Sequence, residues 1–358
     1  MAEARDNGNY IDIVLEGGGV KGIGLAGAYS MLEERGFEAK NIAGTSAGAI
    51  TAALIAAGYR ADELKEIIVS LDFRQFQDEG WEDKIPIFDR TASLLLDQGI
   101  YEGKRFYEWM KELLEAKKIR TFRDLVIKDE TDPKYRSRLQ VIASDVTGRR
   151  LLILPRDAGK LGFDDPDDLE VALAVRMSMS IPIFFEPVRV KNEKTDTNHV
   201  IVDGGMLSNF PVWLFDCEPG EEPEWPTFGL LLVEPEPKKP IGHQLEKGDG
   251  DRGVSALIDY VKAMAQTMME AHDRLYIEQE QFARTIPIPT LGVGTTEFDI
   301  TRERALALYE SGRKATQDFL QTWDFGAYVA AFRQGKEQTR RSAIVEQLEA
   351  QGSPARGR

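Results

Sequence analysis

The chain has 358 residues, of which 42% are hydrophobic and 29% charged, a globular composition that excludes a fibrous, collagen-like or wholly disordered protein. Its 45 basic and 60 acidic residues give a formal net charge of −15, which disfavours nucleic-acid binding because the overall field repels phosphate. The single cysteine excludes an intramolecular disulfide and a cysteine-based zinc site, and it fits a reducing compartment. We therefore expect a cytoplasmic protein of one large α/β domain or two smaller ones.

Two stretches near the start of the chain bear on secretion and membranes. Residues 1–9 are polar and mixed in charge, so they lack the apolar core of a secretory signal, and we expect a tail at the start of the mature protein. Residues 41–59 contain no charged side chain, as a membrane span would. Because alanine, glycine, serine and threonine dominate them, they are too weakly apolar to insert. We expect a tight turn and a buried helix there instead.

The predicted elements begin with two strand–turn–helix units. Residues 10–15 are apolar and β-branched, residues 17–22 read GGGVKG, and residues 22–37 have the pattern of a helix. A second strand at 41–43 is followed by GTSAG and by a helix over 49–59. Consecutive units of this kind favour parallel pairing of their strands.

The rest of the chain alternates further strands with helical segments. Residues 72–123 carry aromatic and charged residues without a clear strand, so we expect a helical excursion from the sheet. Asp165 and Pro166 are typical of a helix start. The stretch TIPIPTLGV, residues 285–293, separates two long predicted helices. Further strands are predicted at 138–144, 150–155, 199–205 and 228–235, and the two long helices at about 254–283 and 301–321.

These elements predict an α/β fold in one piece. Neither an internal repeat nor a sharp break in composition divides the sequence. We expect a catalytic domain over residues 10–325, which includes the excursion, and a polar C-terminal tail over residues 326–358.

The first glycine turn has two interpretations. Gly17, Gly19 and Gly22 satisfy the G-x-G-x-x-G fingerprint of dinucleotide binding, which leaves a nucleotide-binding module open. That fingerprint also needs an acidic residue at the end of the second strand, where this sequence has GTSAG. In the other interpretation, the backbone N–H groups of the turn converge near a helix N-terminus and bind a transient oxyanion.

The second turn contains a candidate nucleophile. GTSAG matches G-x-S-x-G, in which small residues allow a serine to sit on a sharp strand-to-helix turn with its hydroxyl above the sheet. Ser46 is that serine, between Gly44 and Gly48. The alternative is a chance run of small residues at a helix start. The position of the motif, after a strand and about thirty residues beyond a glycine loop, favours catalysis.

A nucleophilic serine needs a base, and histidine is scarce in this sequence. His199, His243 and His272 are the three in the chain, and none has the sequence context of a catalytic imidazole. A carboxylate can act instead if desolvation raises its pKa. Asp203 is the best-placed acid, at the end of an apolar strand and before Gly204 and Gly205. The alternative is a turn-forming Asp-Gly pair.

In the order GGGVKG, GTSAG and DGG, each after a strand, the chain resembles the patatin-like phospholipase family of serine lipid acyl hydrolases. The resemblance spans roughly residues 10–320 and implies a three-layer α/β/α domain with a mainly parallel central sheet. It implies a catalytic dyad of Ser46 and Asp203. The implied oxyanion hole uses backbone amides of Gly18, Gly19 and Val20, and the supporting motif residues are Gly17, Lys21, Gly22, Gly44, Gly48, Gly204 and Gly205.

Two further stretches are similar to family features. SMSIPIFFEPV, residues 178–188, resembles a family segment through its prolines and Phe184, and ASDVTGR, residues 143–149, resembles a bacterial variant. Met179 and Ser180 depart from the family order of small residues, which affects the expected shape of the acyl pocket. Lys21 stands where the family has Arg or Lys, with an anion-steering role and a surface lysine as the two interpretations.

The resemblance implies attack of the serine on a lipid ester, followed by hydrolysis of an acyl-serine, without metal or other cofactor. The expected partners are a phospholipid or other acyl-lipid and, transiently, a membrane surface. The basic and aromatic run over residues 104–123 is a candidate for the membrane-facing element, with a solvated helix as the alternative. An acyltransferase that uses the same acyl-serine is a second function, and an oligomer or an activating factor stays open.

Overall fold

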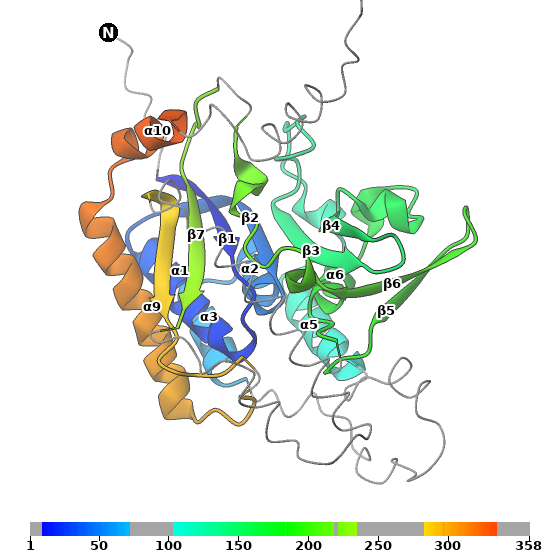
Figure 1. Cartoon of the computed structure of the whole chain (residues 1–358), viewed down its shortest axis with the longest axis horizontal. Helices are drawn as coiled ribbons and strands as arrows, with labels where there is room; N and C mark the ends of the chain where they lie inside the picture. Colours follow the sequence, from blue (N-terminus) through cyan, green and yellow to red (C-terminus); the bar gives the residue numbers. More distant parts are fainter. Residues whose placement is uncertain are drawn as a thin grey trace, which may run out of the picture.

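The computed structural model describes residues 9–71, 103–182, 184–217, 221–234, 283–295 and 297–334. The first part of the expected excursion, most of the first long C-terminal helix, His243 and His272 lie outside the described residues, as does the end of the predicted tail. Figure 1 shows the arrangement of the elements. The strands are β1 (Tyr10–Leu15), β2 (Glu38–Thr45), β3 (Leu139–Asp145), β4 (Arg150–Leu154), β5 (Val188–Asn192), β6 (Thr197–Asp203), β7 (Thr227–Val233) and β8 (Thr285–Pro289). The α-helices are α1 (Ile23–Glu34), α2 (Ala47–Ala56), α3 (Ala61–Val69), α5 (Lys104–Ala116), α6 (Val171–Ser178), α9 (Arg302–Thr322) and α10 (Phe325–Gln334).

The strands form one mixed, mainly parallel sheet in the order β5-β6-β3-β2-β1-β7-β8, with β4 paired to β3. The five neighbours β3, β2, β1, β7 and β8 are parallel. Strands β4 and β6 run antiparallel to β3, and β5 runs antiparallel to β6. The predicted α/β fold with a mainly parallel central sheet and flanking helices is therefore confirmed.

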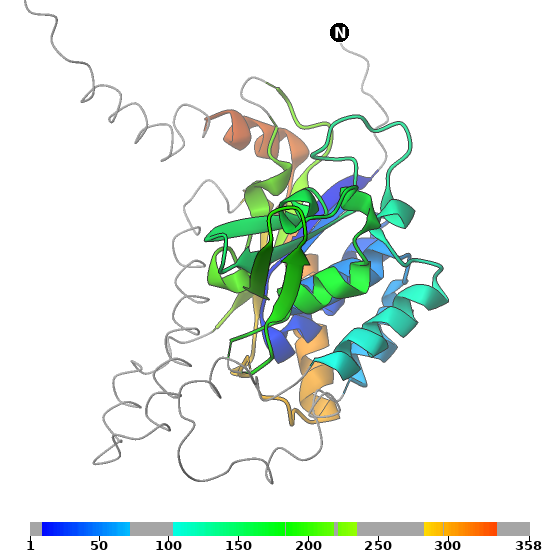
Figure 2. The same cartoon turned by 90° about the vertical axis from the view of Figure 1, so that its right-hand side faces the viewer.

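Strand β1 lies in the interior because both of its faces are apolar. Ile11, Ile13 and Leu15 belong to a large core shared with the helices, whereas Val14 belongs to a second core on the opposite face. This alternation explains why its sequence is a nearly continuous apolar run, as expected for a parallel strand covered on both sides. Among the described residues, the second core is closed by the short 3₁₀ helix Val212–Phe215. Helices α1, α2, α3, α5, α6 and α9 pack against the large core on the other side of the sheet (Figure 2).

The structure corrects three expectations. The stretch at 285–293 contains strand β8 at the edge of the sheet, where proline is tolerated because only one side of the strand is paired. Asp165 does act as a cap, but it caps a 3₁₀ turn at Pro166–Asp168, and α6 starts at Val171. The C-terminal stretch expected to be a polar tail contains most of α10, whose Tyr328 is buried.

Candidate active site

Strand register brings Ser46 and Asp203 to the same level of the sheet. Thr45, the last residue of β2, pairs with Ile142 of β3, and the next residue of β3, Ala143, pairs with Asp203 of β6. Because β6 runs antiparallel to β3, its C-terminal end meets the turn that follows β2. Ala143, a strand residue with a small side chain, therefore separates Ser46 from Asp203, which are 157 positions apart in the sequence.

The turn at Ser46 has the strained geometry expected of a nucleophile elbow. Ser46 has φ 52° and ψ −126°, in the left-handed half of conformational space that non-glycine residues rarely adopt. The flanking glycines are required by close contacts: a Cβ on Gly44 would lie 2.4 Å from the Gly48 carbonyl oxygen, and one on Gly48 would lie 2.4 Å from the Leu15 carbonyl oxygen. Steric crowding thus explains why glycines stand two positions before and after the serine in G-x-S-x-G.

The Asp203 carboxylate is fully buried beside this turn. Its Oδ1 accepts a hydrogen bond from the Gly205 N–H at 2.7 Å. Its Oδ2 is buried and has no fully formed hydrogen bond among the described residues. The Ser46 hydroxyl is near enough to act on the carboxylate as a hydrogen-bond donor. A loose contact of this kind is common in enzymes without bound substrate.

Burial makes Asp203 a carboxylate with the proton affinity of a general base. Desolvation raises its pKa from 3.8 to about 7, and the hydrogen bonds from Ser46 and from the Gly205 N–H lower the pKa by less. Gly204 cannot be replaced without movement, because a Cβ there would lie 2.4 Å from the Ile142 carbonyl oxygen. The Asp203 carboxyl thus lies beside the serine, in addition to capping the turn through the Gly205 N–H.

The glycine loop after β1 lies against the serine. A Cβ on Gly17 would lie 3.1 Å from Ser46 Cβ, so the backbone of this loop reaches the nucleophile turn. Gly19 has φ +56° and packs against the carbonyl of Thr295. The N–H of Val20, expected as an oxyanion donor, donates to that same carbonyl at 3.1 Å. This amide is therefore occupied, whereas the N–H groups of Gly18 and Gly19 have no acceptor among the described residues.

For Lys21, the interpretation as a surface lysine is wrong, and an anion-steering role stays a prediction. Lys21 is buried, so it is not a surface lysine, and its Nζ lies 3.4 Å from Oε1 of Glu234 at the end of β7. The ion pair attaches the glycine loop to the neighbouring strand.

The described histidine is part of a different cluster. His199 is buried, and its Nδ1 lies 2.9 Å from Oδ2 of Asp145, which also accepts from Arg150 Nε at 3.1 Å. This cluster ties β6 to the β3–β4 hairpin. His199 is therefore bound to an acid other than Asp203, which agrees with the expectation that it is not the base.

Sequence reasoning missed the contacts of the end of α6 and the segment after it with Ser46 and Asp203. Ser178 Oγ accepts from the Ser46 N–H at 2.8 Å, and the Ser180 carbonyl accepts from the Asp203 N–H at 2.9 Å. The Ser46 hydroxyl also lies 3.7 Å from Sδ of Met179. The similarity of residues 178–188 to a family segment was the available signal, but it carried no information on these contacts.

The expected membrane-facing helix α5 uses its aromatic and basic residues in other ways. Phe106 is buried in the core. Beyond the helix, Lys117 pairs with Glu63 at 2.7 Å and Arg123 pairs with Asp168 at 2.6 Å. These contacts favour the alternative of a solvated helix packed on the domain. Within the described part of the chain, no group of three or more acidic, histidine or cysteine side chains could hold a metal ion, and no helix is long and apolar enough to cross a membrane.

Comparison with known proteins identifies the family of the chain. Residues 13–216 match the patatin-like phospholipase family. The chain is 39% identical over 317 residues to the uncharacterized protein YqhO of Bacillus subtilis, covering 88% of this chain and all of that protein. It is 24% identical over 213 residues to the probable lipid hydrolase 463L of Invertebrate iridescent virus 6, which covers 57% of this chain and 62% of the viral protein.

Among solved structures, VipD from Legionella pneumophila superimposes with a TM-score of 0.49 and 19% identity, over 88% of this chain and 67% of VipD. The family match and the relative in Bacillus subtilis are the decisive findings. The chain belongs to the patatin-like phospholipase family of lipid hydrolases.

Proposed function

We propose that this protein is a lipid acyl hydrolase of the phospholipase A or lysophospholipase type, with Ser46 as nucleophile and Asp203 as general base. The observation that supports this most directly is a serine hydroxyl on a strained turn, facing a fully buried carboxylate whose pKa is raised to about 7. A carboxylate of this pKa accepts a proton readily near neutral pH.

In the proposed reaction, Asp203 accepts the hydroxyl proton as the Ser46 oxygen attacks the ester carbonyl of the lipid. The N–H groups of Gly18 and Gly19 bind the oxyanion that forms. Loss of one such donor typically lowers the rate by about 10²-fold or more. Collapse of the intermediate transfers the proton to the leaving alcohol and forms an acyl-serine. Water, deprotonated by the same carboxylate, then releases the fatty acid.

Full burial of the nucleophile implies that substrate entry requires a movement of covering side chains. The Ser46 and Asp203 side chains have no exposed surface. We expect a membrane or micelle surface to favour the form in which the covering side chains have moved aside. An acyl chain that passes from this surface into the site exchanges one apolar environment for another. The proposed partner is accordingly an acyl-lipid, met transiently at a membrane surface by a cytoplasmic protein.

A direct test is labelling of the purified chain with a fluorophosphonate, together with lipid analysis of cells that express it. We expect the probe on Ser46, and we expect loss of fatty-acid release and of lysolipid changes in Ser46→Ala and Asp203→Asn. Retention of hydrolysis by Ser46→Ala would contradict the proposal. Addition of an acyl acceptor distinguishes hydrolysis from acyl transfer, since a transferase would yield a new ester in place of free fatty acid.

A further inference from the structure

A short segment that starts at Ser178 accepts hydrogen bonds from the backbone N–H groups of both proposed catalytic residues. Ser178, the last residue of α6, accepts the Ser46 N–H through its side chain, and Ser180 accepts the Asp203 N–H through its carbonyl. Both serines are fully buried, so water does not compete for these bonds. A displacement of this segment would therefore change the distance between the hydroxyl and the carboxylate.

Arg176 fastens this segment at two points. Its Nη1 donates to Ser180 Oγ at 2.6 Å, and that hydroxyl donates back to the Arg176 carbonyl at 2.9 Å. Its Nη2 donates to the Glu186 carbonyl at 2.6 Å, and the guanidinium lies over the Phe185 ring at 5.7 Å. The planar guanidinium thus bonds to both Ser180 and Glu186, a geometry that lysine cannot reproduce.

Burying the charge of this arginine costs free energy, which indicates that the side chain does more than fill space. Only 5% of Arg176 is exposed, and burial lowers its pKa to about 10, so it remains a cation near neutral pH. A buried charge is generally no more stabilising than a well-packed apolar side chain of similar volume. What it supplies here is a pair of directed hydrogen bonds on the segment that contacts Ser46 and Asp203.

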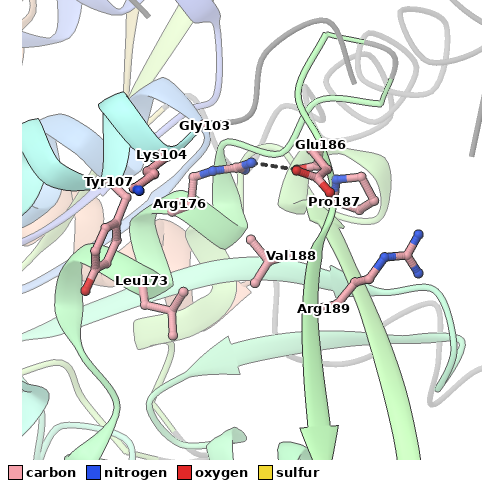
Figure 3. Close-up of a pocket in the computed structure, with 9 residues that line it drawn as sticks. All are labelled: Gly103, Lys104, Tyr107, Leu173, Arg176, Glu186, Pro187, Val188 and Arg189. Atoms are coloured by element: carbon pink, nitrogen blue, oxygen red, sulfur yellow. Dashed lines mark hydrogen bonds between the residues drawn. The ribbon is translucent and has the colours of Figure 1, made fainter. Parts of the chain in front are cut away.

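A cavity of about 330 Å³ lies on the outer side of Arg176, between α5, α6 and β5 (Figure 3). At its rim the backbone of Gly103, the N-cap of α5, packs directly on the guanidinium: a Cβ there would lie 1.9 Å from Arg176 Nε. Arg176 is therefore in contact both with the start of α5 and with the segment that holds the proposed dyad.

We propose that Arg176 is a positioning residue for the proposed hydrolysis, which acts through Ser178 and Ser180 on the geometry of Ser46 and Asp203. The inference rests on the proposed function. It predicts that changes at Arg176, or at Gly103 on its far side, reduce the chemical step without a comparable loss of substrate binding.

The test compares Arg176→Lys and Arg176→Met with wild type in the full-length chain, with a soluble short-chain ester whose leaving group does not titrate between about pH 5 and 9 as substrate. We expect kcat to fall by about 100-fold, because a misplacement of about 1 Å costs that much, and KM to change by less than about threefold. The acid limb of the pH profile of kcat/KM should move to lower pH, because water that reaches a displaced Asp203 reduces its desolvation.

Arg284→Lys is the matched control. Arg284 is also 5% exposed and pairs with Asp216, but it precedes β8 at the opposite end of the sheet. Arg284→Lys should lose about as much thermal stability as Arg176→Lys, without the change in kcat or in the pH profile. Equal effects of Arg176→Lys and Arg284→Lys on kcat and on the acid limb would overturn the inference.

Gly103→Ala tests the same inference from the far side, and it keeps the inference falsifiable if Arg176→Met fails to fold. The added methyl group must displace the guanidinium, so we expect a lower kcat in a protein that retains its far-UV circular dichroism. Wild-type kcat in Gly103→Ala and in Arg176→Lys would also overturn the inference. If instead Ser46→Ala hydrolysed the ester as well as wild type, the proposed function itself would fail, which is a distinguishable result.

Discussion

At the scale of single residues, the most informative group is the Asp203 carboxyl. Its pKa of about 7 arises from desolvation, and the hydrogen bonds that oppose this shift come from the Gly205 N–H and from the Ser46 hydroxyl. The environment thus makes the carboxylate basic enough to accept the proton of a serine without an intervening imidazole.

This pKa predicts the pH dependence of hydrolysis. The base must be ionised, so kcat/KM should rise with pH through about 7 and reach a plateau above it. Below pH 6 the rate should fall about tenfold per pH unit, as expected for one titrating group. Initial rates between pH 5 and 9, on an ester whose leaving group does not titrate in this range, would measure it. An acid limb near pH 4 would show that Asp203 is solvated or is not the base.

Met179 is the residue expected to shape the acyl site. Its sulfur lies 3.7 Å from the Ser46 hydroxyl, and its side chain is buried. Met179→Ala should enlarge this space and raise the preference for a long or branched acyl chain over a short one by about tenfold, the usual effect of one or two methylene groups in an apolar pocket. The ratio of kcat/KM values for the two esters is the measurement.

Met177→Ala is the control for this change. Met177 is also fully buried, in α6, so its truncation costs core packing in the same way. It should lower thermal stability and leave the ratio of acyl preference unchanged. A change of the ratio in both variants would assign the effect to a general loosening of α6.

At the scale of elements, the glycine loop depends on a segment far along the chain. Thr295, in the connection between β8 and α9, accepts the Val20 N–H. The same connection contacts the segment after α6, because Phe298 packs edge-on against Phe184 with ring centroids 6.3 Å apart. It lies beyond residue 216, where the family match ends, so the site is supported by residues outside the matched region.

Gly19→Ala tests this dependence. The residue has φ +56°, and a Cβ would lie 2.0 Å from the Thr295 carbonyl oxygen, so the loop must shift. We expect a loss of activity of about 10²-fold through misplaced oxyanion donors, and a loss of stability of about 1 kcal/mol or more. Rates of hydrolysis and chemical denaturation of the purified variant measure the two effects.

Gly292→Ala provides the matched comparison, since Gly292 has φ +73° with nothing within 4 Å of the added methyl group. Like Gly19→Ala, Gly292→Ala places an alanine in the left-handed conformation, but its methyl group collides with no other atom. Stability should fall by about 1 kcal/mol while activity is retained. Equal activities of the two variants would show that the Gly19 contact does not position the donors.

The sequence predicts local elements well and non-local contacts poorly. Strand β1 and the Ser46 turn are encoded within a few residues, by an apolar run and by glycines that avoid close contacts. In contrast, the meeting of Ser46 with Asp203 depends on the register of both strands with β3, which no local pattern contains. Strand β8 was missed because its prolines argue against a strand unless its place at the sheet edge is known. The contacts of Arg176 were missed because a long polar side chain gives no sign in the sequence of being buried.

At the scale of the whole molecule, a net charge of −15 opposes adsorption to an anionic membrane, so contact with lipid must rest on apolar groups. Among the described residues, three large apolar side chains are exposed just after strands of the sheet that carries the site: Val146, 55% exposed after β3, and two leucines. Leu207, which follows the Asp203 turn, is 40% exposed, and Leu291, which follows β8, is 50% exposed. Their loops lie at the ends of strands on opposite sides of the glycine loop.

We predict that these two leucines contact the lipid surface. Leu207→Glu with Leu291→Glu should reduce co-sedimentation with zwitterionic vesicles and hydrolysis of vesicle lipid, because each change removes apolar contact and adds a charge. Hydrolysis of a monomeric soluble ester should be retained. Phe325→Glu, at a 37% exposed site in α10, is the control and should leave vesicle binding unchanged. Unchanged sedimentation of the double variant would exclude this face as the contact surface.

The fold also contains a second buried carboxyl. Comparison of the two carboxyls separates the effect of a buried charge on stability from its effect on catalysis. Burial raises the pKa of Asp12 in β1 to about 7, against the lowering effects of Trp225, the Asn41 N–H and Lys134. Asp12 and Asp203 both have folded-state pKa values above the unfolded value of 3.8, so the folded protein binds more protons between pH 4 and 7. The free energy of unfolding should therefore fall as pH rises through this window and remain low above pH 7.

Replacement of either carboxyl by an amide removes the cost of burying its charge. Asp203→Asn and Asp12→Asn should each raise the thermal midpoint at pH 8 by a few °C, and this gain should shrink as pH falls through 7 toward 4. Only Asp203→Asn should abolish hydrolysis, since Asp12 lies toward the opposite end of β1 from the site. Thermal unfolding at pH 5 and 8, with activity measured on the same samples, tests both statements. A midpoint gain in Asp203→Asn that is equal at both pH values would mean that its carboxyl is protonated, or solvated, throughout this range. In that case Asp203 could not be the base whose ionisation controls the reaction.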